Sequence, residues 1–111
     1  MKASLLIALL AVVSASAHAG AGAAAQKAEV CAACHGADFN TPISADIPRL
    51  AGQYPDYLAR ALTDYKSGAR KNALMNGQAE GLSAQDITEL SAYIGALPSS
   101  LIVIPLHRFI R

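Results

Sequence analysis

The sequence lacks features that mark several common classes of protein. Tryptophan is absent, cysteine occurs only twice, and aromatic residues make up 5% of the 111 residues. The formal net charge is only +1, so no basic excess points to nucleic acid as a partner. No apolar run reaches the ~20 residues of a membrane-spanning helix. A chain of this length has room for one domain, so these absences favour a small single-domain protein.

The first 19 residues have the layout of a secretory signal peptide. Lys2 supplies a positive start, an unbroken apolar run covers residues 5–13, and small residues lead to Ala-His-Ala at positions 17 to 19. We expect cleavage after Ala19, with Ala17 as the second choice; an uncleaved anchor is the alternative, which the short apolar run disfavours. Export brings a chain into an oxidising compartment, where nearby thiols tend to pair. The two cysteines therefore need an explanation.

The first half of the remaining chain predicts two helices joined by a loop. Residues 20–28 predict a flexible start that passes, through alanine-rich sequence, into a helix running toward Cys31. Residues 36–53 hold several Gly, Pro and turn-forming residues and predict a loop. The next helix is expected to begin at Pro55 and to end at Gly68. Its apolar stripe consists of Tyr57, Leu58, Ala61, Leu62 and Tyr65.

The second half predicts one long helix. Residues 69–82 contain two glycines and predict a loop with a short helical turn. Ser83 and Asp86 then nearly match a capping box, and Pro98 ends the helix. The buried stripe is expected to be Ile87, Leu90, Tyr93, Ile94 and Leu97. No strand pattern precedes residue 100, so the fold class is all-α, with three to four short helices and a core thin enough to need something else in its middle.

Both cysteines belong to the stretch Cys31-Ala32-Ala33-Cys34-His35, which has the C-x-x-C-H spacing of c-type haem attachment. Two cysteines one helical turn apart can reach the two vinyl groups of one haem. The histidine that follows then lies beneath the iron as its axial ligand. The motif therefore predicts one covalently attached haem c.

Three other interpretations of the motif are weaker. A thioredoxin-type redox pair requires a preceding strand and a βαβ setting. Structural zinc needs four ligands, and His107 is the sole further candidate once the leader is removed. A disulfide across two residues strains the bond geometry and leaves His35 without a role. Export also agrees with haem, because c-type haem is attached outside the cytoplasmic membrane.

The second axial ligand decides the chemistry of such an iron. Met75 is the one methionine after the leader, forty residues beyond His35, and it lies in a polar, glycine-broken stretch that suits a ligand better than a core filler. His107 is the rival. Met and His together raise the reduction potential relative to two histidines, which suits an electron carrier. An open iron would instead bind gases or react with peroxide.

Other residues around the haem are assigned from weaker signals. The second ring nitrogen of His35 needs an acceptor that fixes the ring, and we expect the carbonyl of Pro48, although an ordinary turn proline is an equal alternative. Contacts with the haem propionates, or simple surface positions, are expected for Arg49, Gln53, Tyr54 and Tyr57.

With these features in place, the chain resembles a class I c-type cytochrome, and most of all the small bacterial monohaem cytochromes and a single half of the dihaem c-four type. The resemblance runs from Glu29 to Pro98 and rests on "VCAACHG", "IPRLAGQYPDYL" and "LMNGQAEGLSAQDITELSAYIGAL". It implies a small cytochrome c fold in which the first and last helices cross and enclose the haem with the loops. It also implies Met75, eight residues before Ser83, as the ligand, and Pro48 as the partner of the axial histidine.

The expected organisation is a signal peptide over residues 1–19, a cytochrome c domain over 20–98 and an apolar tail over 99–111. The tail departs from the family pattern. It could contact a partner or a membrane surface; the alternatives are that it is disordered or that it results from an altered reading frame. No second C-x-x-C-H follows, so a dihaem form is not expected for this chain.

The expected function is that of a periplasmic electron carrier and not of an enzyme. Its partners would be a membrane-bound quinol-oxidising complex and a terminal oxidase or reductase. The alternative is an electron-entry haem subunit of a periplasmic dehydrogenase, or a peroxidase-like protein with an open iron.

Overall fold

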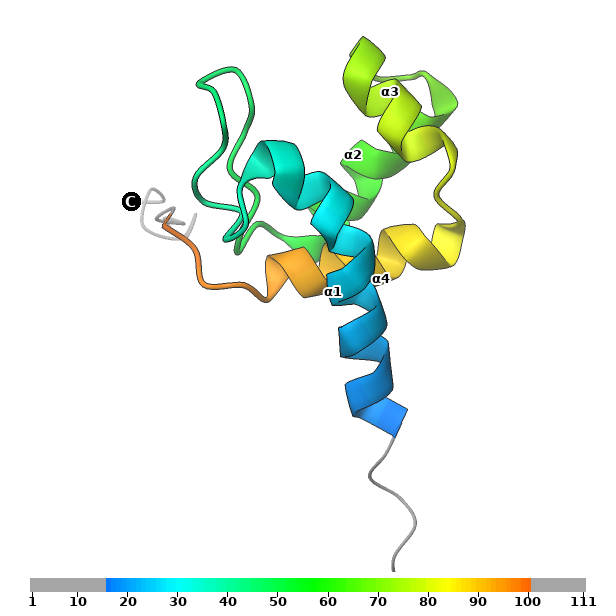
Figure 1. Ribbon diagram of the computed structural model, residues 1–111. Helices are drawn as coiled ribbons and strands as arrows, with labels where there is room; N and C mark the ends of the chain where they lie inside the picture. The colour runs from blue at the N-terminus through cyan, green and yellow to red at the C-terminus, as the bar shows by residue number, and fades with distance from the viewer. Residues whose placement is uncertain (1–15, 101–111) are drawn as a thin grey trace, which may run out of the picture.

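Four helices make up the described part of the chain. The computed structural model describes residues 16–100 (Figure 1), and its helices are α1 Ser16–His35, α2 Pro55–Ser67, α3 Ala73–Glu80 and α4 Ala84–Gly95. No strand occurs among these residues, which confirms the all-α prediction. The apolar run of the leader, the tail beyond residue 100 and His107 lie outside the described residues. Between residues 16 and 100, no helix combines the length and apolar character needed to cross a membrane.

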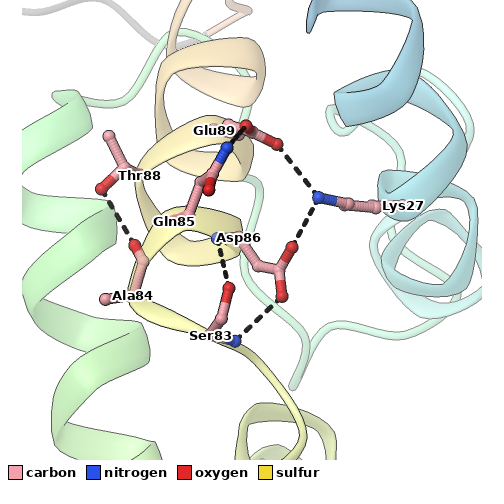
Figure 2. A network of polar contacts seen from close by, with 7 residues as sticks. All are labelled: Lys27, Ser83, Ala84, Gln85, Asp86, Thr88 and Glu89. Atoms are coloured by element: carbon pink, nitrogen blue, oxygen red, sulfur yellow. Dashed lines mark hydrogen bonds and ion pairs between the residues drawn. The ribbon is translucent and has the colours of Figure 1, made fainter.

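Helices α1 and α4 cross and form the centre of the molecule (Figure 1). Ala28 of α1 is 2% exposed and belongs to one buried cluster with Leu90 and Ile94 of α4. A side chain as small as alanine lets the two helices approach closely. The crossing is also bridged by charge: the Lys27 Nζ lies 2.5 Å from the Asp86 Oδ1 and 3.0 Å from the Glu89 Oε2 (Figure 2).

The start of α4 is fixed by a complete capping box, as predicted. The Asp86 backbone N–H donates to the Ser83 Oγ at 3.0 Å, and the Ser83 N–H donates to the Asp86 Oδ2 at 2.9 Å (Figure 2). Asp86 therefore both caps α4 and forms an ion pair with Lys27 of α1. The predicted stripe is buried at Ile87, Leu90 and Ile94 and half-buried at Tyr93 and Leu97.

Helix α2 also matches its predicted bounds. Pro55 lies in its first turn, and Gly68 ends it in the left-handed region, with φ 81°. Leu58 is buried between neighbouring helices, but Tyr57 is 51% exposed, so the predicted stripe is wrong at that residue. Because successive residues of a helix point about 100° apart, Leu58 can face the core while its neighbour Tyr57 faces solvent.

The structure corrects two further predictions. Residues 20–28 are not a flexible start, because α1 already covers them; alanine favours the helix and Gly20 and Gly22 do not interrupt it. Residues 69–82 hold more than a helical turn, because α3 forms there. Its first turn is capped by Asn72, whose Oδ1 accepts from the Met75 N–H at 3.1 Å. Residues 16–100 thus form four helices, and α1, with 20 residues, is not short.

The buried core is thin, as the sequence predicted. Its main cluster has six buried residues, of which two are alanines: Ala28, Phe39, Ala51, Leu58, Leu90 and Ile94. Alanine contributes little apolar area, so this cluster supplies a small hydrophobic driving force for a domain of this size.

Candidate haem-binding site

The C-x-x-C-H motif forms the last turn of α1. Cys31 and Cys34 lie one turn apart, with Cys31 half-buried, Cys34 exposed and both thiols unpaired. Burial raises the pKa of the Cys31 thiol above its ordinary value. His35 ends the helix and is only 7% exposed. One helix end thus presents both predicted attachment points and the predicted ligand together.

The turn after the motif requires glycine. Gly36 has φ 92°, a region that residues with a Cβ rarely adopt, and a Cβ built there would collide with the Thr41 carbonyl oxygen. The Gly36 N–H donates to the Ala32 oxygen at 2.9 Å and closes α1. The chain then returns to the helix, where the Ile43 N–H donates to the Cys34 oxygen at 3.0 Å. This return holds residues 36–53 against the end of α1.

The His35 ring is oriented by the carbonyl of Pro48. The His35 Nδ1 lies 2.8 Å from the Pro48 oxygen. A carbonyl can only accept, so Nδ1 carries a proton in this contact, and the neutral form of the ring then keeps its lone pair on Nε2, where it can bind a metal. The structure therefore places Pro48 where the sequence expected it, in contact with His35, and puts the ring in the tautomer of an axial ligand.

Phe39 supports this arrangement, and the sequence analysis missed it. It is 2% exposed and has φ 56°, unusual for a residue other than glycine. Its carbonyl accepts from the Leu50 N–H at 2.8 Å and from the Ala51 N–H at 3.1 Å, which anchors the segment that follows Pro48. The one available signal was that Phe39 is the one aromatic residue in the stretch 36–53.

Met75 lies on α3 and not in a loop as predicted. It lines a pocket of about 380 Å³ together with Cys31. The pocket lining is mostly apolar and consists of Lys27, Val30, Cys31, Leu62, Met75, Gln78, Gly81, Leu82, Asp86 and Leu90. Cys34, His35 and Pro48 are not part of this lining. The structure thus brings Met75 and one attachment cysteine to the same cavity, with the remaining motif residues at the adjoining end of α1.

Most of the chain matches one family model, described as cytochrome c, over residues 19–98. The chain belongs to the cytochrome c family. It is 44% identical to cytochrome c4 of Pseudomonas aeruginosa over 87 residues, and this match covers 77% of this chain and 43% of that relative. It is 41% identical over 100 residues to the thiosulfate dehydrogenase electron acceptor of Thiomonas intermedia, covering 90% of this chain and 46% of that protein.

The solved structures agree with the family assignment. The structure of cytochrome c4 from Acidithiobacillus ferrooxidans superposes with a TM-score of 0.65 at 31% identity, over 71% of this chain and 50% of that one. The chain therefore spans about half the length of these relatives and corresponds to a single half of a dihaem c4-type cytochrome.

The residues described above fit the haem c that this family binds. Two unpaired cysteines stand one helical turn apart, an adjacent buried histidine directs Nδ1 at the Pro48 carbonyl, and a mostly apolar cavity reaches Cys31. Within residues 16–100, no cluster of three or more His, Cys, Asp or Glu side chains could hold a metal ion by itself. The donor set is that of a cytochrome c family member.

The side chains considered for the propionates lie apart from the pocket lining. Arg49, Tyr54 and Tyr57 are exposed, and Gln53 is half-buried with its Oε1 accepting from the Tyr54 N–H at 2.9 Å. The propionate contacts expected for these four residues stay a prediction.

Proposed function

We propose that this chain carries one electron at a time on a single haem c, bound covalently through Cys31 and Cys34 and ligated by His35 and Met75. The observation that supports it most strongly is the His35 Nδ1 contact with the Pro48 oxygen at 2.8 Å, at the end of a C-x-x-C-H helix in a member of the cytochrome c family. This contact leaves Nε2 as the coordinating atom.

Each residue has a separate task in this proposal. The two thiols would form thioether bonds with the haem vinyl groups, so the haem would not dissociate from the protein. Pro48 fixes the His35 ring and raises its basicity as a ligand. The Met75 thioether would be the second ligand of the haem iron; it would exclude substrates from the iron and favour its reduced state. When bound, haem c supplies one-electron redox chemistry at its iron.

The cellular setting is part of the proposal. The leader-like first 19 residues support export to the periplasm, where haem c proteins act. We expect electrons to arrive from a membrane-bound quinol-oxidising complex and to leave to a terminal oxidase or reductase. Such redox encounters bury small interfaces and are brief.

A second candidate places the electron source in a periplasmic dehydrogenase. It is supported by the similarity to a protein named thiosulfate dehydrogenase electron acceptor. The two candidates share the haem site and differ in the donor. Stopped-flow mixing of the oxidised protein with quinol and membranes that contain a quinol-oxidising complex, or with a thiosulfate dehydrogenase and thiosulfate, separates them by which mixture reduces the haem.

Carbon monoxide binding tests the proposed ligation and the carrier function together. The reduced holoprotein should not bind carbon monoxide and should titrate with a one-electron slope. Met75→Ala should bind carbon monoxide readily and show a lower reduction potential, because the thioether is lost. Leu74→Ala is the matched control, since Leu74 precedes Met75 on α3 and is 75% exposed. Rapid carbon monoxide binding by the unaltered protein would refute a closed iron and favour an open, peroxidase-like site.

A further inference from the structure

Asn76, the residue after Met75, connects three separate pieces of backbone through one amide group. Its Nδ2 donates to the Tyr65 oxygen at 2.6 Å and to the Arg70 oxygen at 2.9 Å. Its Oδ1 accepts from the Asn72 N–H at 2.9 Å. These partners lie at the end of α2, in the connection between α2 and α3, and at the cap of α3.

The orientation of this amide follows from its partners. Both groups facing Nδ2 are carbonyl oxygens, which only accept, and the group facing Oδ1 is an N–H, which only donates. Three of the four hydrogen-bonding positions of the amide are therefore in use. One of them is a second hydrogen bond to the Tyr65 carbonyl, which lies in the last turn of α2 and also accepts from the Gly68 N–H at 3.3 Å.

Helix α3 has few other attachments. It has eight residues, and among the described helices it packs only against α2. An isolated helix of this length is not stable in water, so its position depends on such contacts. The cap bond from the Met75 N–H to Asn72 and the amide of Asn76 hold the backbone on both sides of Met75.

We infer that Asn76 is a positioning residue for Met75: its amide fixes α3 on the end of α2 and thereby keeps the thioether in the cavity shared with Cys31. This inference rests on the proposed axial role of Met75. It adds that the Met75 side of the site is held in part by a side chain that itself touches no proposed haem ligand atom.

The test measures release of Met75 separately from unfolding. In the oxidised holoprotein, the near-infrared sulfur-to-iron band is followed during a titration to alkaline pH, and global unfolding is followed by far-ultraviolet circular dichroism in urea. The variants are Asn76→Ala, which removes the amide, and Asn76→Asp, which keeps its shape but turns an oxygen toward the carbonyls of Tyr65 and Arg70.

Asn40 provides the matched control. Its Nδ2 donates to the Asp38 and Pro98 oxygens and its Oδ1 accepts from the Ser100 N–H, so it also joins separate backbone segments with three bonds, but away from α3. Asn40→Ala should lower the unfolding midpoint and leave the pH of band loss unchanged.

Both Asn76 variants should lose the band at lower pH, with the ratio of Met-bound to Met-free protein reduced roughly tenfold, because Asn76→Ala loses all three hydrogen bonds and Asn76→Asp loses the two that Nδ2 donates. Asn76→Asp should be affected more. The inference is overturned if the band survives to the same pH as in the unaltered protein, if Asn40→Ala shifts it equally, or if both Asn76 variants simply fail to fold. Absence of the band from the unaltered protein would instead refute Met75 as a ligand.

Discussion

The two sides of the proposed haem site are built in different ways. On the His35 side, the ligand lies at the end of a helix packed across α4, next to both attachment cysteines, and residues 36–53 return to it through the Pro48 and Phe39 carbonyls. On the Met75 side, the ligand lies on an eight-residue helix that packs against α2 alone among the described helices.

This difference indicates which of the two proposed ligands is released more readily. Several independent constraints hold His35, so no single hydrogen bond decides its position. The position of Met75 depends on a short helix and a few polar contacts. Small free-energy changes should therefore release Met75 while the His35 side and the fold persist.

The largest expected effect comes from removing the attachment itself. Cys31→Ala/Cys34→Ala should contain no haem that survives acid-acetone extraction. It should also unfold at a much lower temperature, because the six-residue core cluster, with its two alanines, is too thin to support the domain well. Thermal circular dichroism and the extraction assay measure both effects. Ala33→Ser, between the two cysteines, is the control and should keep its haem.

The His35 side can be disrupted at its turn. Gly36→Ala places a Cβ against the Thr41 oxygen and in a left-handed backbone region, which should reduce the free energy of unfolding by at least about 2 kcal/mol. Urea denaturation at neutral pH measures it. An unchanged midpoint would show that the turn after the motif differs from the one described.

The ion pair that joins α1 to α4 predicts a pH dependence. Lys27 lowers the pKa of the Asp86 carboxyl well below its usual range. Gln85, followed by Lys27, lowers that of Glu89, and the two carboxylates raise the pKa of Lys27. Carboxylates with lowered pKa values stabilise the fold above their unfolded values of about 4 and lose that contribution as the pH falls. The lysine contribution is present below its unfolded value of about 10.4 and is lost as the pH rises through its raised folded value.

Lys27→Met should therefore have a lower urea midpoint than the unaltered protein at pH 7, and the difference should shrink toward pH 2 and in 1 M salt. Lys71→Met, which removes an exposed lysine elsewhere, is the charge control. A difference that persists unchanged at pH 2 would mean that packing of the Lys27 stem, and not the ion pair, joins the helices.

The smallest expected effect strengthens the Met75 side. Gly77 lies within α3, and a Cβ there would meet nothing within 4 Å. Gly77→Ala should stabilise the helix by about 0.5–1 kcal/mol and raise the pH at which Met75 is released, because alanine loses less backbone entropy than glycine. A variant that releases Met75 at unchanged pH would show that the stability of α3 does not control the ligand.

The same contrast explains what the sequence could predict. The capping box at Ser83 and the proline start of α2 are local signals, and the structure confirms the helices that they predict. The C-x-x-C-H spacing is a local signal too, and the haem attachment that it predicts stays a prediction. Helix α3 was missed because Gly77 and Gly81 indicate a loop. The cap of Asn72 was a local signal, since it bonds the N–H of Met75 three residues on, but the Asn76 amide depends on the Tyr65 carbonyl, which only folding brings near. The role of Phe39 was missed for the same reason, since its two hydrogen bonds reach across the loop.

The near-infrared spectrum of the oxidised holoprotein at neutral pH tests the central claim most directly. The account predicts a sulfur-to-iron band in the unaltered protein, its retention in Leu74→Ala and its loss in Met75→Ala. A spectrum without the band in the unaltered protein, or a band that survives in Met75→Ala, would contradict His35 and Met75 as the axial pair.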